Sequence, residues 1–289
     1  MSGLNPGFVH CPLCGEDAFR TIYRCAAPFM QIVRCRRCRM MYQNPRIAET
    51  EMPDAYQVIE GYGRFAEQDS AKRALFRMRI EGFARERGLP SRGSFLDYGA
   101  SRGVMLDCVA ELLPDWERAA VELSPSAREH LAERGHGAVR AFEDLPPGQT
   151  FDWVNIDNVL EHLPNPLETL VHLKSRLNAG GFIYVEVPNE SFLPVRYRVN
   201  DLVRGVSKPP TAEGHINLFT PRTLRKLFRA AGFRCERFWL ESVSRPYRLK
   251  GALGADETPQ IARVFRFLRV TRLDVALRAA YFLCARIQA

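Results

Sequence analysis

Short apolar runs and amphipathic stretches alternate through the middle of the chain. The apolar runs are closed by turn-forming or polar residues and predict strands at 94–100, 116–123, 136–140, 151–159, 182–189 and 234–242. The stretches between them space their apolar residues at helical intervals and predict helices at 104–113, 124–135, 166–181 and 221–233. Strands that alternate with helices of about 10–15 residues predict an α/β fold, a doubly wound and mostly parallel sheet with helices on both faces.

Both flanks of this alternating region differ from it. Residues 66–88 place Leu75, Met78 and Phe83 at helical intervals and predict a helix before the first strand. Near the C-terminus, 258–280 is predicted to be helical with scattered basic residues. Residues 279–287 form either a final strand or a continuation of that helix. For the helix 124–135, Ser124 or Ser126 is available as the N-cap.

Four of the eight cysteines form two similar pairs near the N-terminus. Cys11 and Cys14 in HCPLCG, and Cys35 and Cys38 in VRCRRCRM, have two residues inside each pair and 20 between the pairs. This spacing is typical of a zinc ribbon, in which each pair lies on a tight knuckle. Two disulfides are the alternative, and they fit poorly because the chain shows no secretory signal. Four thiolates leave no open coordination position, so the predicted Zn²⁺ is structural.

The composition is that of an ordinary globular protein, with 46% apolar and 26% charged residues. The N-terminus lacks a basic start followed by an apolar run, and no apolar stretch approaches the roughly 20 residues of a membrane span. The expected location is therefore cytoplasmic. The net charge of +8 is concentrated at the two ends, where 1–50 carry seven Lys/Arg against three Asp/Glu and 241–289 carry nine against four. The middle of the chain is close to neutral.

The stretch FLDYGASRG, 95–103, predicts a strand that ends in a glycine turn and opens a helix. A pyrophosphate, a nucleoside triphosphate and S-adenosylmethionine compete for such a turn. Triphosphate loops need a Lys and dinucleotide folds need GxGxxG, whereas here three residues separate Gly99 from Gly103. Asp97 suits an ammonium group, and Glu122, at the end of the next strand, suits a ribose diol. The two acids together favour S-adenosylmethionine.

Residues 94–240 resemble the class I S-adenosylmethionine-dependent methyltransferases. The resemblance is carried by FLDYGASRG, AVELS, FDWVNIDNVLEHLPNP, LNAGGFIYVEVPN and HINLFTPRTLRKLFRAAGF. The front end, CPLCG with IVRCRRCRMMYQNPR, is similar to the zinc ribbon that some members carry, including sugar C-methyltransferases. Arg39 departs from this pattern because Gly is usual at its knuckle position. We therefore predict a zinc ribbon (1–50), a helical lid or linker (51–93), the methyltransferase domain (94–242) and a basic C-terminal segment (243–289).

The resemblance implies cofactor contacts at the carboxyl ends of the strands. The implied residues are Asp97, Gly99, Ala100, Ser101, Gly103, Glu122, Leu123, Phe142, Asp157 and Asn158. The glycine turn would surround the methionine half, while Glu122 would hold the ribose and Leu123 would pack on the adenine. A backbone amide near Phe142 would also contact the adenine. Asp157 and Asn158 would close the site beneath the sulfonium.

Two histidines are candidates for the base that deprotonates an acceptor. His162 lies in LEHLPNP and His215 in EGHINLF. The resemblance favours His215, because sugar-methylating members place a catalytic His in a comparable segment, and a structural role stays open for both. Glu161 is interpreted as a helix-start acid, with a substrate ligand as the alternative.

The leading functional hypothesis is methyl transfer to a small molecule at oxygen or carbon. A sugar, a nucleotide-linked sugar, a glycolipid or a related metabolite is the expected acceptor. An RNA methyltransferase that binds RNA through the ribbon and the basic termini ranks second, because the middle of the chain is neutral. A non-catalytic cofactor-binding protein ranks third, because Asp97 and Glu122 are intact. The C-terminal segment either packs on the catalytic domain or lies on an anionic membrane surface.

Overall fold

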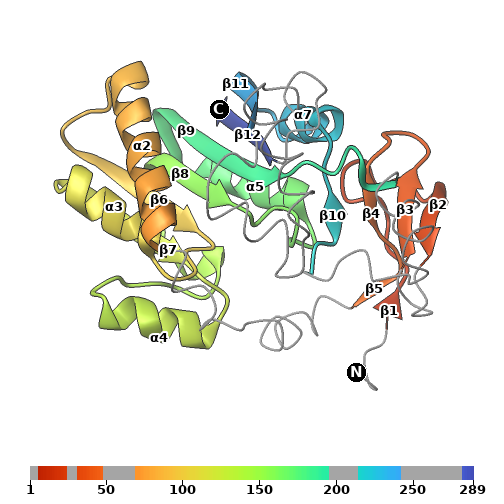
Figure 1. Ribbon diagram of the computed structural model, residues 1–289, viewed down its shortest axis with the longest axis horizontal. Helices are drawn as coiled ribbons and strands as arrows, with labels where there is room; N and C mark the ends of the chain where they lie inside the picture. The colour runs from red at the N-terminus through yellow and green to blue at the C-terminus, as the bar shows by residue number, and fades with distance from the viewer. Residues whose placement is uncertain (1–5, 25–30, 48–68, 195–213, 242–281) are drawn as a thin grey trace, which may run out of the picture.

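The computed structural model of the chain describes residues 6–24, 31–47, 69–194, 214–241 and 282–289. Its centre is a six-stranded sheet in the order β11-β12-β9-β8-β6-β7 (Figure 1). Strands β6, β7, β8 and β9 run parallel, and β12 is antiparallel to both of its neighbours. The predicted doubly wound, mostly parallel sheet is therefore confirmed. The strand bounds are Gly93–Tyr98 for β6, Trp116–Val121 for β7, Phe151–Asp157 for β8, Leu177–Pro188 for β9, Arg234–Glu241 for β11 and Phe282–Gln288 for β12.

Five helices accompany the sheet in the part of the chain that the structure describes. They are α2 (Asp69–Arg87), α3 (Val104–Leu112), α4 (Pro125–Glu133), α5 (Pro166–Ser175) and α7 (Pro221–Ala230). Ser124 is the N-cap of α4, and its hydroxyl accepts a hydrogen bond from the Ala127 amide at 3.3 Å. The predicted lid before 69 and the predicted helix within 243–281 lie outside the described residues.

Two local predictions are wrong. The helix predicted over 166–181 ends at Ser175, and the glycine-containing stretch after it belongs to β9, because Leu177 pairs with Phe151 of β8. The strand predicted at 136–140 is reduced to one isolated bridge between Val139 and Val121. In the first place long-range backbone pairing prevails over the local pattern, and in the second the local pattern finds too little pairing to form a strand.

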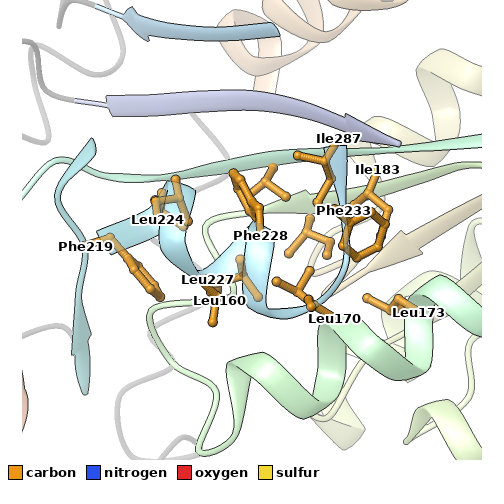
Figure 2. Close-up of a cluster of buried hydrophobic side chains, with 14 of the residues drawn as sticks. Leu160, Leu170, Leu173, Ile183, Phe219, Leu224, Leu227, Phe228, Phe233 and Ile287 are labelled. Carbon is orange, nitrogen blue, oxygen red and sulfur yellow. The ribbon is translucent and has the colours of Figure 1, made fainter. Parts of the chain in front are cut away.

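Successive side chains of the parallel strands point to opposite faces of the sheet, and both faces are buried. Phe95, Trp153 and Phe182 pack with apolar residues of α2 and α3. Their neighbours along the strands, such as Val154 and Ile183, belong to a second cluster with α5 and α7. Figure 2 shows this second cluster, where α7 and α5 lie against the sheet. The two-sided burial explains why residues of both alternating sets along β8 and β9 are apolar and buried.

The N-terminal region forms its own small sheets. Its strands are β1 (Pro6–Gly7), β2 (Phe19–Arg24), β3 (Gln31–Cys35), β4 (Met41–Gln43) and β5 (Arg46–Ile47). The order β10-β4-β3-β2 includes β10 (Asn217–Leu218), which comes from the segment just before α7 (Figure 1). The Gln43 amide also donates to the Ile216 carbonyl at 2.9 Å. The N-terminal region is therefore joined to the domain by backbone hydrogen bonds as well as by a shared core.

The chain ends in a strand, which decides between the two predictions for 279–287. In β12, Cys284 pairs with Glu186 of β9 and with Trp239 of β11. The last strand is thus inserted between two earlier ones, away from the edges of the sheet. Among the described residues, the helices are too short or too polar to cross a membrane.

Candidate active site

The glycine turn follows β6 and packs tightly against its surroundings. Gly99 and Gly103 have φ values of 84° and 75°, in the left-handed region that favours glycine. A Cβ atom on Gly99 would lie 2.4 Å from Cγ2 of Val159, and one on Gly103 would lie 2.5 Å from Cδ2 of Leu131. Both glycines are therefore required by shape as well as by backbone conformation. The turn lies directly against the segment that follows β8.

Glu122 lies just beyond β7, and backbone amides of two loops fix its buried carboxylate. The Ser101 amide donates to Oε2 at 2.7 Å, and the Ser124 amide donates to Oε1 at 2.9 Å. A carboxylate can accept about four hydrogen bonds, so these two bonds orient Glu122 for further donors. Glu122 thus connects the glycine turn to the start of α4.

Asp97 lies at the carboxyl end of β6 and is almost fully buried. The side-chain amide of Asn155 on β8 donates to its Oδ1 at 2.8 Å. Burial raises the pKa of Asp97 to about 7, the hydrogen bond from Asn155 lowers it, and the charges of Asp157 and Glu122 raise it further. The environment of Asp97 is therefore rich in negative charge and suits a cationic ligand.

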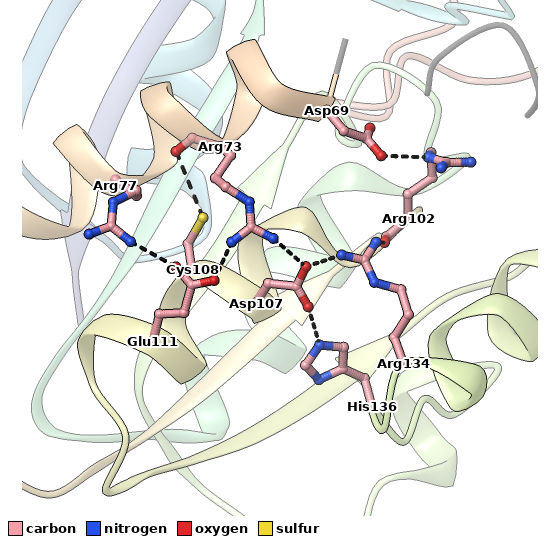
Figure 3. Close-up of polar contacts among 9 residues, drawn as sticks. All are labelled: Asp69, Arg73, Arg77, Arg102, Asp107, Cys108, Glu111, Arg134 and His136. Atoms are coloured by element: carbon pink, nitrogen blue, oxygen red, sulfur yellow. Dashed lines mark hydrogen bonds and ion pairs between the residues drawn. The ribbon is translucent and has the colours of Figure 1, made fainter. Parts of the chain in front are cut away.

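A network of charged side chains from α2, α3 and the end of α4 supports the glycine turn (Figure 3). Asp107 on α3 accepts a hydrogen bond from Nη2 of Arg73 at 3.0 Å, lies 2.7 Å from Nε2 of His136 and pairs with Arg134. Arg134 also donates to the Arg102 carbonyl at 2.6 Å. The network therefore connects α2, α3 and the end of α4 to the backbone of the turn.

Asp157 and Asn158 lie where β8 ends, as predicted, but Asp157 is part of a buried ion pair. Nη1 of Arg79 on α2 donates to Asp157 at 2.9 Å, and Nη2 donates to Glu186 of β9 at 2.8 Å. The Tyr184 hydroxyl donates to the same oxygen of Glu186 at 2.8 Å. Asn158 has a φ of 57° and donates to Asp157 at 2.5 Å. One buried arginine thus holds two carboxylates beneath the predicted cofactor site.

The structure brings His162 and His215 together just beyond β8. Their ring centroids are 4.8 Å apart, at an interplanar angle of 76°. Nδ1 of His162 lies 3.2 Å from the Gly214 carbonyl oxygen, and Nδ1 of His215 lies 4.0 Å from a carboxylate oxygen of Glu190. Burial lowers the pKa of His162 to about 3, so this imidazole is neutral at physiological pH. Both candidate histidines therefore belong to one cluster.

Glu161 does not start a helix, which corrects the sequence-based interpretation. It lies in the turn after β8, whereas α5 begins at Pro166. Its side chain is almost fully buried, and neither carboxylate oxygen has a hydrogen-bond partner among the described residues. Burial raises the pKa of Glu161 to about 8, and the charge of His215 lowers it. The alternative interpretation of Glu161, a ligand for a substrate, stays a prediction.

Two predicted adenine contacts have contrasting surroundings. Leu123 is 38% exposed directly after Glu122, which leaves apolar surface for a flat ring. Phe142, in the short 3-10 helix Phe142–Asp144, stacks on His172 at 6.3 Å and lies under Arg176. The Phe142 ring is thus already packed, and its backbone is the part that suits the predicted contact.

Cys11, Cys14, Cys35 and Cys38 are free thiols whose sulfur atoms all lie within 4.8 Å of one another. Sγ of Cys11 is 3.4 Å from Sγ of Cys38, and Sγ of Cys14 is 3.6 Å from Sγ of Cys35. A tetrahedral site with Zn–S bonds of about 2.3 Å places sulfurs about 3.8 Å apart, so the four thiols fit a zinc ion. Arg39 adopts a φ of 72°, the left-handed conformation that Gly15 has in the first knuckle. With Arg39 in place of the usual glycine, the second knuckle therefore has the same left-handed backbone conformation as the first.

Three residues of the site were missed from the sequence: Arg79, Asn155 and Glu186. Each was visible as a polar residue inside an apolar pattern. Arg79 lies between Leu75 and Phe83 on the buried face of α2, whereas Met78 is 64% exposed. Periodicity alone had favoured Met78 for that face.

The comparisons with known proteins show the family of this chain. A family model described as "Methyltransferase domain" matches residues 65–237. The mitochondrial ubiquinone biosynthesis O-methyltransferase of Candida albicans is 28% identical over 108 residues, which cover 34% of this chain and 33% of that protein. The chain spans about a quarter to a third of the length of the curated relatives it matches.

Solved structures of methyltransferases share the fold. A SAM-dependent methyltransferase from Archaeoglobus fulgidus aligns with a TM-score of 0.52 at 18% identity, over 80% of this chain and 100% of that one. The plantazolicin methyltransferase BpumL, solved in complex with SAH, aligns with a TM-score of 0.53 at 14% identity, over 82% of this chain and 90% of that one. At these identities the likeness establishes the fold.

Proposed function

Because this chain belongs to the methyltransferase-domain family and has the class I fold of S-adenosylmethionine-dependent methyltransferases, we propose that it transfers a methyl group from S-adenosylmethionine to a small molecule. The proposed acceptor is a hydroxyl or an acidic carbon of a sugar, nucleotide-linked sugar, glycolipid or related metabolite. One observation supports the donor above all others. Asp97 and Glu122 flank a glycine turn whose two glycines are tightly packed, and both carboxylates are held by directed hydrogen bonds.

The sulfonium of the cofactor supplies an electrophilic methyl group, so the residues of the chain mainly bind and orient. Glu122 would accept hydrogen bonds from the ribose diol, and Asp97 would favour the ammonium group by charge. Orientation of two reactants can lower a barrier by about 7–11 kcal/mol in favourable cases. The cluster of His162 and His215 lies at the same edge of the sheet and is the proposed place where the acceptor loses its proton.

We further propose that the four cysteines bind one structural Zn²⁺. The ion would hold the ribbon, whose strand β4 pairs with β10, and β10 begins two residues after His215. Lys226 on α7 also donates to the Cys38 carbonyl at 3.0 Å. The ribbon would thereby keep the His215 segment in place, which gives it a part in the acceptor site.

A methyl-donor assay with labelled S-adenosylmethionine over nucleotide sugars, lipid extracts and RNA tests this proposal. We expect transfer to a small-molecule pool and none to RNA, and transfer to RNA alone would contradict the acceptor class.

Glu122→Ala should weaken cofactor binding by about 1–3 kcal/mol, the scale of hydrogen bonds to a charged group. Isothermal calorimetry would measure this loss, with the exposed Glu117→Ala on β7 as the control. Unchanged affinity in Glu122→Ala would refute the ribose assignment.

Cofactor affinity should depend on pH through Asp97. Its pKa of about 7 lies above the ordinary 3.8, so the carboxyl gains a proton as the pH falls below 7. The protonated form cannot attract an ammonium group, so affinity should fall about tenfold per pH unit below that value and level off above it. Calorimetry between about pH 5 and 8 would measure the slope. Asp97→Asn should bind weakly with a flatter profile, and an equally steep profile in this variant would assign the titration elsewhere.

A further inference from the structure

A buried acid, Glu161, lies with the two histidines beyond β8, and removal of a proton by the histidines does not explain it. One ligand-type atom from each of Glu161, His162 and His215 lies within 4.8 Å of the other two. Glu161 is 1% exposed, and both of its carboxylate oxygens are buried without a hydrogen-bond partner among the described residues. A buried carboxylate without hydrogen bonds is costly, so its retention here needs a reason.

The backbone holds this cluster in place from both sides. The Glu161 carbonyl accepts hydrogen bonds from the amides of Ile216 and Asn217, both at 2.9 Å. The Asn217 side chain in turn donates to the carbonyls of Leu160 and Leu163, at 3.2 and 2.6 Å. Residues 161 and 215 are therefore adjacent because two segments far apart in the chain are joined by backbone and side-chain bonds. A site fixed in this way needs little reorganisation to bind a ligand.

The surroundings of the histidines suit metal ligation. Nδ1 of His162 lies 3.2 Å from the Gly214 carbonyl oxygen, and donation from Nδ1 keeps the lone pair on Nε2 for an ion. Glu190 lies 4.0 Å from Nδ1 of His215. A carbonyl or a carboxylate behind each imidazole is the usual way in which ligating histidines are oriented.

The buried Arg79 is committed to carboxylates other than Glu161. Arg79 is directed to Asp157 and Glu186, with which it forms hydrogen bonds at 2.9 and 2.8 Å. An added cation would give the carboxylate its missing partner. Two imidazoles and one carboxylate form a donor set that suits first-row divalent ions and leaves coordination positions open.

We propose that Glu161, His162 and His215 bind a divalent transition-metal ion, such as Mn²⁺, Fe²⁺ or Zn²⁺, at the acceptor side of the methyl-transfer site. The ion would coordinate the oxygen of a hydroxyl acceptor, lower its pKa and hold it for attack on the methyl group. In this arrangement the histidines hold the ion and the metal-bound oxygen releases its proton to solvent or buffer. The binding of the ion stands on the geometry alone, and its part in catalysis rests on the proposed function.

Titration of the full chain with Mn²⁺, with the four-cysteine site preloaded with zinc, tests the proposal. Manganese prefers nitrogen and oxygen donors and competes poorly for four thiolates. Electron paramagnetic resonance of the free ion should show one Mn²⁺ taken up per chain. Glu161→Gln keeps the shape of the side chain and should lower the affinity by about tenfold or more. Glu168→Gln, the same change at an exposed position of α5, should bind Mn²⁺ like the wild type.

Thermal unfolding gives a second test, in which the order of the two proteins' unfolding midpoints depends on whether Mn²⁺ is present. Mn²⁺ should raise the midpoint of the wild type and leave that of Glu161→Gln unchanged. Without metal, Glu161→Gln should unfold at a higher temperature than the wild type, because it removes a buried and uncompensated acid. No uptake of Mn²⁺ by the wild type, or equal uptake by Glu161→Gln, would overturn the proposed site.

The proposed function and the metal site can fail separately. Calorimetry with S-adenosylmethionine on the same preparations should give equal affinity in wild type and Glu161→Gln. If Mn²⁺ binds but no acceptor is methylated, the metal site stands and the proposed function fails. If methyl transfer by the wild type is as fast with chelator present as with Mn²⁺ bound, the catalytic role of the ion is wrong.

Discussion

Replacing Arg79 with methionine is expected to lower the free energy of unfolding by about 3–5 kcal/mol, the usual cost of removing one partner from a buried ion pair. The Arg79 side chain is 5% exposed and Glu186 is fully buried, so water cannot replace the lost partner. The arginine also lies 4.1 Å over the Tyr184 ring. Methionine retains part of this packing, so most of the loss should come from charge. Urea unfolding followed by circular dichroism would measure it.

Arg77→Met provides the matched control on the same helix. Arg77 pairs with Glu111 at 2.7 Å on the surface (Figure 3), with side chains that are 40% and 45% exposed. An exposed pair of this kind contributes about 0–1 kcal/mol. The loss of unfolding free energy in Arg79→Met should also become smaller as the pH is lowered from about 8 to 5. Protonation of the carboxylates of Asp157 and Glu186, which lack the arginine in this variant, removes their buried charge. If Arg79→Met loses no more unfolding free energy than Arg77→Met, the buried ion pair is not needed for stability.

Loss of the predicted zinc is expected to unfold the N-terminal ribbon. Structural zinc sites in small domains bind with an apparent free energy of about 10–16 kcal/mol, more than the short strands β1 to β5 can replace. Cys35→Ser should therefore lower the zinc content by about one ion per chain and expose 6–47 to proteases. Elemental analysis and limited proteolysis would measure both effects.

The effect should reach the catalytic domain through the shared sheet. Once β4 is lost, β10 has no partner strand, and the segment with His215 is released. Cys235→Ser is the control, because Cys235 on β11 is outside the cluster. This variant should keep the zinc and the fold. Two results would contradict the prediction. One is a zinc content in Cys35→Ser equal to that of the wild type, and the other is a wild-type protein that contains no zinc and is unaffected by chelators.

Much of the fold was predictable because its signals are local. The strand and helix patterns of 94–135, the N-cap at Ser124 and the glycine turn each depend on residues a few positions apart. The cysteine spacing belongs to the same class, since each knuckle forms within a few residues. Even where Arg39 replaced the expected glycine, the second knuckle kept its conformation.

The remaining site residues depend on contacts between distant parts of the chain. Arg79 meets Glu186 across 107 positions, and no local pattern links the two. In the same way β12 enters the sheet between β9 and β11, where only backbone pairing decides its place. The position of Glu161 likewise depends on hydrogen bonds from the amides of residues 216 and 217 to its carbonyl, which no pattern around residue 161 indicates.

The amino-acid sequence by itself determined the class of fold, the glycine turn with its two acids and the four-cysteine pattern, because these follow from periodicity, backbone conformation and ligand spacing. Only the tertiary structure decided which charges are buried together and which side chains gather beyond β8. Desolvation and ion pairing depend on distances through space, and a linear pattern does not contain those distances.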